Sequence, residues 1–146
     1  MMGLVIAVIA VVVLAALAAA GLFLWRKRPQ ELKATEYYEG QWKQLQSLLK
    51  DKAQWANAIT QADKLLDTAL KKRHIRGRSM GERLVKAQRL FTDNDGLWFG
   101  HKLRNRIDAD PTVKLKEAEV KQALLGTRQA LKDVGALPDA SARNQK

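Results

Sequence analysis

"AQWANAITQADKLLDTALKKR", residues 53–73, has the most regular pattern in the chain. Its apolar residues recur three and four positions apart, which places them on one face of an α-helix. They are Trp55, Ala58, Ile59, Ala62, Leu65, Leu66, Ala69 and Leu70. Small residues in this stripe allow a neighbouring helix to approach closely. The pattern predicts a helix over residues 53–73 that is packed into a helical core.

Helical spacing continues on both sides of this segment. Residues 29–51 place tyrosine, tryptophan and leucine side chains at helical intervals. Residues 79–92 form the next predicted helix, because "SMGE" is a capping box with Ser79 at the N-cap and Glu82 three residues later. The residues of this helix expected to face the core are Leu84, Val85, Ala87, Leu90 and Phe91.

Two further helices are predicted in the C-terminal part. The first covers residues 97–109 and is stopped by Pro111, since the residue before a proline avoids the α region. The second follows Thr112, a candidate N-cap, and ends at Gly135, a candidate C-cap. Its predicted core residues are Leu115, Val120, Ala123, Leu124, Leu131 and Val134.

The N-terminal residues 1–25, "MMGLVIAVIAVVVLAALAAAGLFLW", contain no charged side chain. Roughly 20 apolar helical residues cross a bilayer core, so this segment is long enough to span a membrane. A cleaved signal peptide has its positive charge in front and an apolar core of roughly 7 to 15 residues. Here the charge follows the apolar run. We therefore expect an uncleaved anchor with Trp25 at the membrane interface and with Arg26, Lys27 and Arg28 in the cytoplasm.

The composition limits the rest of the chain. It has 146 residues and no cysteine, which excludes disulfides and cysteine-ligated metals, and its two histidines leave little for another metal site. No segment after the anchor alternates with the period of a strand. The predicted fold class is all-α, a transmembrane helix followed by an antiparallel bundle of four to five helices. The predicted boundaries are an anchor at 1–25, a basic juxtamembrane linker at 26–30, a helical domain at 31–137 and a polar disordered tail at 138–146.

Basic residues are concentrated in residues 71–89, which contain Glu82 as their single acid. We call these eight side chains the basic surface: Lys71, Lys72, Arg73, Arg76, Arg78, Arg83, Lys86 and Arg89. Three interpretations stay open, namely a solvated helix end, a site for RNA phosphates and a site for anionic lipid. No aromatic residue lies among them, which disfavours stacking on single-stranded nucleic acid.

Polar residues form a second strip in "GHKLRNRIDADP", residues 100–111. Phe99, Leu103 and Ile107 recur every four residues and form the buried edge of a helix. The adjoining strip contains His101, Arg104, Asn105 and Asp108. The spacing allows an ion pair between Arg104 and Asp108 and a contact between His101 and Asn105. Such a strip is either a catalytic site or a structural network between helices.

The segment "LWFGHKLRNRID", residues 97–108, resembles HEPN-type helical domains, as do "WANAITQADKLLDTALKKR" and "SMGERL" before it and "KEAEVKQALLGTRQALKDVGAL" after it. It is most similar to a bacterial subgroup with the pattern A-H-K-x-R-N-x-I-x-H-E. The resemblance covers about residues 30–137. It implies a four- or five-helix bundle, frequent homodimerisation and, in active members, metal-independent RNA cleavage. The motif of active members is an arginine, a polar residue and a histidine four to six residues on.

The motif implied by the resemblance is incomplete in this chain. Its arginine corresponds to Arg104 and its polar residue to Asn105, but the histidine falls at Ala109. No side chain there exchanges protons near neutral pH as an imidazole does. Active members often have a histidine at the position of His101 as well, where the resemblance implies a positioning role.

The sequence thus predicts a bacterial single-pass membrane protein with its N-terminus outside and its C-terminal domain in the cytoplasm. We expect a HEPN-like module that binds rather than cleaves, as a homodimer with Leu97 and Trp98 at its seam. No cofactor, metal or small-molecule substrate is indicated. The rival interpretation is a membrane-tethered ribonuclease of a toxin or defence system, with Arg104, Asn105 and His101 as catalytic candidates. A basic scaffold for nucleic acid or anionic lipid is the third.

Overall fold

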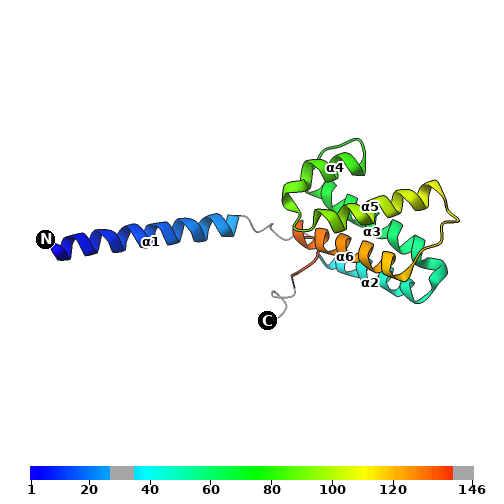
Figure 1. Cartoon of the computed structure of the whole chain (residues 1–146), viewed down its shortest axis with the longest axis horizontal. Coiled ribbons are helices and arrows are strands. Elements are labelled where there is room, and N and C mark those ends of the chain that lie inside the picture. Colours follow the sequence, from blue (N-terminus) through cyan, green and yellow to red (C-terminus); the bar gives the residue numbers. More distant parts are fainter. Residues whose placement is uncertain (27–34, 140–146) are drawn as a thin grey trace.

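All regular elements that the computed structural model describes, within residues 1–26 and 35–139, are helices (Figure 1). Three short 3-10 segments connect them, η1 (Leu48–Lys50), η2 (Lys52–Gln54) and η3 (Gln88–Leu90). The α-helices are α1 (Met2–Arg26), α2 (Thr35–Ser47), α3 (Trp55–Lys72), α4 (Met80–Ala87), α5 (Asn94–Ala109) and α6 (Glu117–Asp133). The predicted all-α fold is confirmed.

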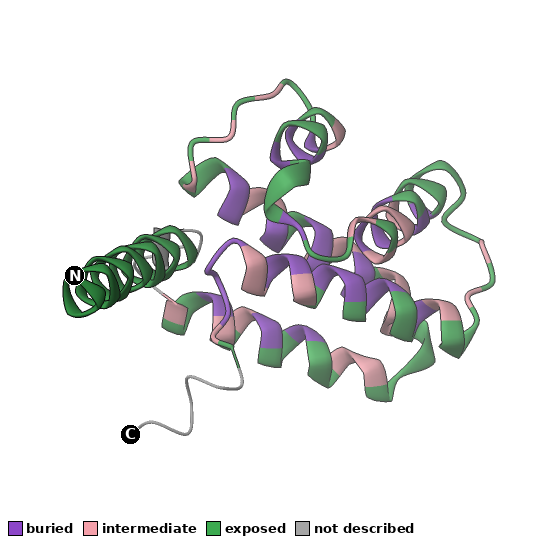
Figure 2. Cartoon of the chain, turned by 60° about the vertical axis from the view of Figure 1, so that its left-hand side comes forward, coloured by how far each residue is buried: buried purple, intermediate pink, exposed green. Residues whose placement is uncertain are grey.

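Helix α1 is long and apolar enough to cross a membrane over Met2–Leu24. Its side chains through Leu24 are exposed along their whole length, as the uniform green of this helix in Figure 2 shows. The span Met2–Leu24 is uncharged and has no buried face, which is consistent with a lipid environment. The predictions for the side chains of Trp25, Arg26, Lys27 and Arg28, and for residues 140–146 of the polar tail, lie outside the described residues.

Helix α3 is the central element of the bundle, because it packs against α2, α4, α5 and α6. Seven residues of its predicted apolar stripe are buried and the eighth, Trp55, packs on the core from its edge. The helix starts slightly later than expected. Asp51 caps the preceding 3-10 segment by accepting a hydrogen bond from the Ala53 amide.

Several segments meet at one end of the bundle, which we call the tether end because the chain from α1 enters the bundle there. Helices α2 and α3 are antiparallel neighbours joined only by residues 48–54, so Thr35 lies near the last turns of α3 (Figure 1). The guanidinium of Arg73, just after α3, donates a 2.7 Å hydrogen bond from Nε to the Val134 carbonyl just after α6. The start of α2 and the ends of α3 and α6 are therefore close together.

Helices α5 and α6 form the most extensive helix pair, and glycines allow their backbones to approach closely. A Cβ atom at Gly126 would lie 2.2 Å from the carbonyl carbon and oxygen of Gly96. A Cβ atom at Gly100 would lie 3.0 Å from the Ala123 carbonyl oxygen. No side chain fits in these gaps, so the glycines set the separation of the two helices. The sequence analysis did not single them out.

The caps of α4 and α6 confirm some local predictions and correct others. The Ser79 hydroxyl accepts from the Glu82 amide as expected, whereas the Glu82 carboxylate accepts from the Arg78 amide, one residue before the N-cap. Gly135 has a φ of 76° after α6, in agreement with its predicted role. Thr112 is not the N-cap of α6, because its amide and hydroxyl both donate to the Asp110 carboxylate.

Two predictions of inward-facing residues in the 79–92 segment were wrong. Val85 and Leu90 are 53% and 45% exposed, while Leu84, Ala87 and Phe91 are buried as predicted. The α-helix ends at Ala87 and continues as the 3-10 segment η3. A 3-10 helix has about 3.0 residues per turn, so the face that an α-helical pattern would bury shifts after Ala87, which accounts for Leu90. Val85 lies within α4, and its side chain faces solvent next to the buried Leu84.

Two glycine substitutions test the α5–α6 contact. Gly126→Ala should lower the free energy of unfolding by about 3 kcal/mol, since its methyl group overlaps the Gly96 backbone. Gly40→Ala is the matched control in α2, with no atom within 4 Å of the new methyl, and should raise stability by about 0.5–1 kcal/mol. Chemical denaturation followed by tryptophan fluorescence measures both. Equal stability of Gly126→Ala and the wild type would contradict the close approach.

Candidate functional site

A buried histidine–aspartate pair joins α5 to α3. The Nδ1 atom of His101 lies 2.9 Å from Oδ1 of Asp63, and both residues are 6% exposed. An ionised carboxylate only accepts hydrogen bonds, so the imidazole donates from Nδ1. The pair spans 38 positions of sequence and fixes the rotation of α5 against α3.

Arg104 extends this pair toward the surface. Its Nε lies 3.8 Å from Oδ2 of Asp63, its Nη2 lies 3.1 Å from Oδ2 of Asp108, and its Nη1 donates to Oδ1 of Asn105 at 3.3 Å. Asp63 therefore lies between the imidazole and the guanidinium and interacts with both. Asn105 and Asp108 are exposed, so the network passes from the core to solvent along one strip of α5.

The imidazole of His101 is enclosed on its other sides. The Trp98 ring meets it edge-on, with ring centroids 5.7 Å apart and an interplanar angle of 83°. A Cβ atom at Gly81 of α4 would lie 3.7 Å from Nε2 of His101. Thus Nδ1 is bound by Asp63, while Nε2 is next to the backbone of α4. A general base must reach the proton that it removes, and this ring is surrounded by α3, α4 and Trp98.

The structure brings the four predicted strip residues together with a fifth residue, Asp63, which the sequence patterns did not identify. His101 bonds to Asp63, not to the predicted Asn105, and the ion pair predicted for Arg104 and Asp108 is present. A signal for Asp63 exists in the sequence. It lies four residues after Ile59 and three before Leu66, so helical spacing places this acid inside the apolar stripe of α3.

The positions around the missing motif histidine have structural roles. Ala109 is the exposed last residue of α5. The next residue, Asp110, holds the following turn, and hydrogen bonds from the hydroxyl and amide of Thr112 keep the pKa of its carboxyl below the ordinary value. No group at the end of α5 therefore replaces an imidazole near Arg104.

The predicted dimer seam needs a correction. Leu97 is only 1% exposed and belongs to the core of the single chain. Because α5 begins at Asn94, three residues earlier than expected, Leu97 lies in its first turn against the bundle. Trp98 is half-buried on His101. The homodimer itself stays a prediction.

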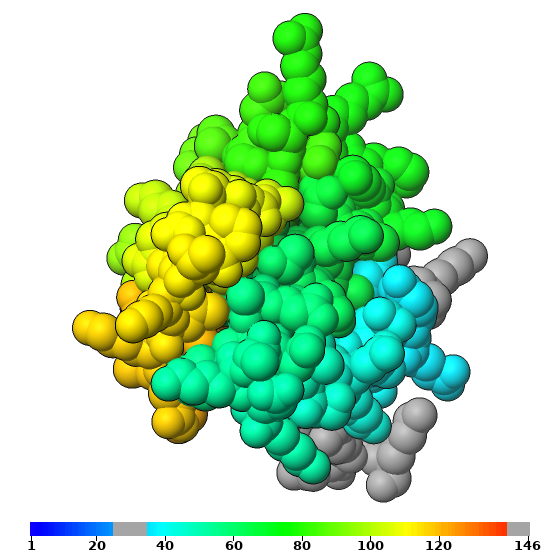
Figure 3. Space-filling model, turned by 90° about the vertical axis from the view of Figure 1, so that its right-hand side faces the viewer, coloured from blue at the N-terminus to red at the C-terminus, as the bar shows by residue number. Residues whose placement is uncertain are grey.

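The basic surface is exposed at six of its eight residues. These are Lys71, Lys72, Arg76, Arg78, Lys86 and Arg89. Figure 3 shows side chains of the segment between α3 and α4, coloured green, projecting outward from the bundle. Arg73 is half-buried against the Val134 carbonyl. Lys71 is paired with Asp67 at 2.8 Å, so the side chains available to an external partner are Lys72, Arg76, Arg78, Lys86 and Arg89.

Arg83 is not part of the exposed surface, contrary to its prediction. It is buried, and its guanidinium bonds the Asp67 carboxylate of α3 and the Gly77 carbonyl. Burial alone would raise the pKa of the Asp67 carboxyl, but hydrogen bonds from Arg83 and Lys71 outweigh it and lower this pKa below its ordinary value. The pair fastens α4 to the last turns of α3.

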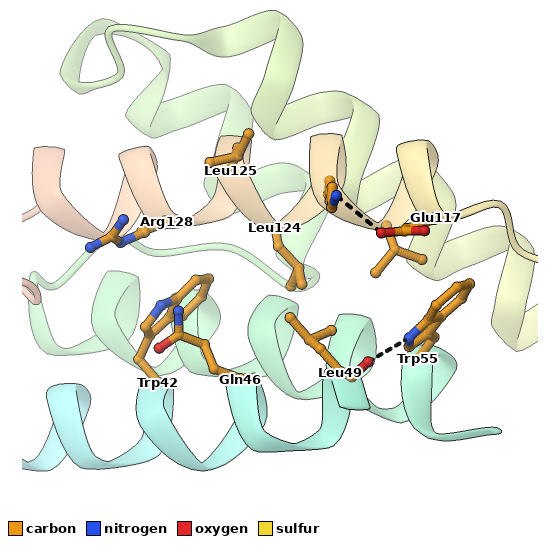
Figure 4. A pocket seen from close by; sticks show the side chains of 10 residues that line it. Trp42, Gln46, Leu49, Trp55, Glu117, Leu124, Leu125 and Arg128 are labelled. Atoms are coloured by element: carbon orange, nitrogen blue, oxygen red, sulfur yellow. Dashed lines mark hydrogen bonds and ion pairs between the residues drawn. The ribbon is translucent and has the colours of Figure 1, made fainter. Parts of the chain in front are cut away.

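An apolar groove of about 320 Å³ lies between α2 and α6 (Figure 4). Trp42 and Arg128 lie at one end, and Trp55 and Glu117 at the other. The two indoles differ, because Trp55 Nε1 donates to the Leu49 carbonyl at 3.0 Å while the buried Trp42 Nε1 has no hydrogen-bond partner.

Comparison of the chain with models of protein families, with curated proteins and with solved structures finds no match. In the described parts of the chain, no three histidine, aspartate or glutamate residues are grouped to hold a metal ion. The site is therefore interpreted from its own geometry.

The buried ion pair of α4 yields a prediction with a pH dependence. Asp67→Asn leaves Arg83 buried without a countercharge and should cost about 3 kcal/mol of stability at pH 7. Because the folded pKa of Asp67 is lowered, its contribution is full above the unfolded value of about 3.9 and is lost as the pH falls through the folded value. Thermal unfolding of the wild type and the variant should therefore differ at pH 7 and converge at low pH.

The matched control is Glu117→Gln in the exposed ion pair of Glu117 and Lys121, whose side chains are 67% and 71% exposed. This change should cost less than about 0.5 kcal/mol. Equal losses in the two variants at pH 7 would contradict the buried role of Arg83.

Proposed function

We propose that this protein is a membrane-anchored, HEPN-like helical module that acts by binding and has no ribonuclease activity. One observation carries the proposal. Within the described residues, the histidine of α5 is enclosed, with Nδ1 of His101 on Asp63 and its ring 6% exposed. The imidazole of α5 is thus occupied in holding α3 and α5 together, and the position of the motif histidine is Ala109.

The chemistry of the remaining groups supports the same conclusion. RNA cleavage without a metal requires a group that removes the proton of the attacking hydroxyl and another that protonates the leaving group. Arg104 stays charged at all physiological pH values and so stabilises charge but exchanges no proton. Asn105 does not titrate, and Ala109 has no polar group. His74, the other histidine of the chain, is exposed in the loop after α3 and belongs to a different segment.

Anchoring in a membrane is the second part of the proposal. Helix α1 has the length and the apolar surface of a transmembrane helix over Met2–Leu24. Positive residues follow it directly on the C-terminal side, at Arg26, Lys27 and Arg28. The positive-inside rule then puts the bundle in the cytoplasm. The proposed protein is a cytoplasmic helical domain held at the inner face of the cell membrane.

A cleavage assay tests the absence of ribonuclease activity. The full-length protein, purified in detergent, is incubated with mixed RNA in the presence of a metal chelator, beside Arg104→Ala and Arg106→Ala variants. Arg106 is the control, because it is exposed on the same helix and pairs with Glu119 outside the network. We expect all three proteins to release the same background of RNA fragments, with a retained helical circular dichroism spectrum.

The rival function gives a different pattern. A ribonuclease that uses the strip of α5 would release fragments with the wild type and with Arg106→Ala, but not with Arg104→Ala. That pattern, in a variant with unchanged helicity, overturns the proposal.

A further inference from the structure

We propose that the bundle docks on the membrane through α4, which places an apolar and basic face on anionic lipid headgroups. The docking face consists of Val85, Lys86, Arg89 and Leu90, and all four are exposed. The inference rests on the proposed membrane anchor and is independent of whether the bundle cleaves RNA. The experiment therefore distinguishes a failure of membrane docking from a failure of the proposed anchor.

The docking face combines the two properties of a helix that binds at a membrane interface. Val85 and Lys86 lie in the last turn of α4, and Arg89 and Leu90 lie in the 3-10 segment η3 that continues it, whereas Leu84 and Ala87 are buried. The two aliphatic side chains are about half exposed, so the folded bundle itself does not cover them. Interfacial helices insert such apolar side chains at the boundary between headgroups and acyl chains, with lysine and arginine beside them.

Residues 71–89 contain eight basic side chains and a single acid, Glu82, and the next acids along the chain are Asp93, which caps α5, and Asp95. Arg76, Arg78 and Lys72 are exposed in the segment that leads into α4. Asp67, the nearby acid of α3, is already paired with Arg83 and Lys71. Glu82 accepts the Arg78 amide at the N-terminus of α4. The surface that an anionic headgroup would meet therefore carries uncompensated lysine and arginine side chains.

The segment that contains α4, between Arg73 and Thr92, lies at the tether end of the bundle. Arg73 is bound to the Val134 carbonyl at 2.7 Å, and the Thr92 amide donates to the Asp133 carboxylate at 2.8 Å. Both ends of the segment that contains α4 are thus attached at the end of α6, where α2 also begins. The eight residues between α1 and α2 span at most about 29 Å, at about 3.6 Å per residue. An anchored α1 keeps this end of the bundle within reach of the bilayer surface.

A membrane surface fits these observations better than RNA does. RNA phosphates would attract the basic residues but would leave the aliphatic Val85 and Leu90 in water. Residues 71–89 also contain no aromatic side chain on which bases could stack. A lipid surface matches both the charge and the aliphatic side chains. Attachment through α1 also makes docking an intramolecular step, which raises the effective concentration of lipid around α4.

The absence of cysteine in the chain makes a site-specific test possible, because one introduced cysteine is the only label site. Full-length Val85→Cys is labelled with an environment-sensitive fluorophore and reconstituted into vesicles of phosphatidylcholine alone or with one third phosphatidylglycerol. Leu125→Cys is the matched control, an aliphatic residue of α6 that is 65% exposed and lies outside the docking face. Emission and access to an aqueous quencher are compared.

We expect the Val85 label to shift to shorter wavelength and to become at least several-fold less accessible to quencher in the anionic vesicles only. The Leu125 label should behave alike in both vesicles. Lys86→Glu combined with Arg89→Glu should abolish the Val85 response while leaving the helical spectrum unchanged. Raising the salt concentration should weaken the fluorescence response of the Val85 label.

Other outcomes overturn the inference. Equal exposure of the Val85 and Leu125 labels in anionic vesicles excludes docking, and protection of the Val85 label by added RNA but not by anionic lipid assigns the surface to nucleic acid. Protection in both kinds of vesicle excludes recognition of anionic headgroups. Failure of the protein to co-sediment with any vesicle would instead refute the proposed anchor, and a cleavage result alone would leave the docking face unaffected.

Discussion

The bundle depends on the close approach of α5 to α6. Because the backbone of Gly96 lies where a side chain at position 126 would have to be, the separation and rotation of the two helices are fixed by glycine. Successive residues of an α-helix are about 100° apart. With Gly100 turned toward α6, the next residue, His101, faces α3 and meets Asp63. A contact between two backbones thus determines the surroundings of the histidine.

The orientation of α5 gives its polar strip a structural role, whereas the resemblance to HEPN domains associates these positions with RNA cleavage. An imidazole used for proton transfer must reach substrate, whereas His101 is enclosed between helices and bound by a carboxylate. Arg104 borders solvent, yet its guanidinium is shared by Asp63, Asp108 and Asn105. The strip serves as a connection between α3 and α5. Exposed basic residues near α4 and the apolar groove beside Trp42 are the surfaces open to a partner.

Sequence patterns were sufficient where a local rule decides the structure. Helical spacing identified the buried stripe of α3, and the Ser79 cap and Gly135 terminator were found from their residue types. Patterns failed where tertiary contacts decide. Arg83 was assigned to the surface because its partner Asp67 lies on another helix, and the exposure of Leu90 follows from a change of helix type after Ala87. The glycines of α5 and α6 acquire their importance only from the opposing backbone.

The burial of His101 is the central claim, and the two histidines of the chain allow it to be measured directly. Diethyl pyrocarbonate acylates accessible imidazoles, and peptide mass spectrometry reports the modified residue. His74 is exposed and serves as the internal reference. The structure predicts rapid modification of His74 in the folded protein and modification of His101 only after unfolding. Similar rates for both residues in the folded protein would contradict the account.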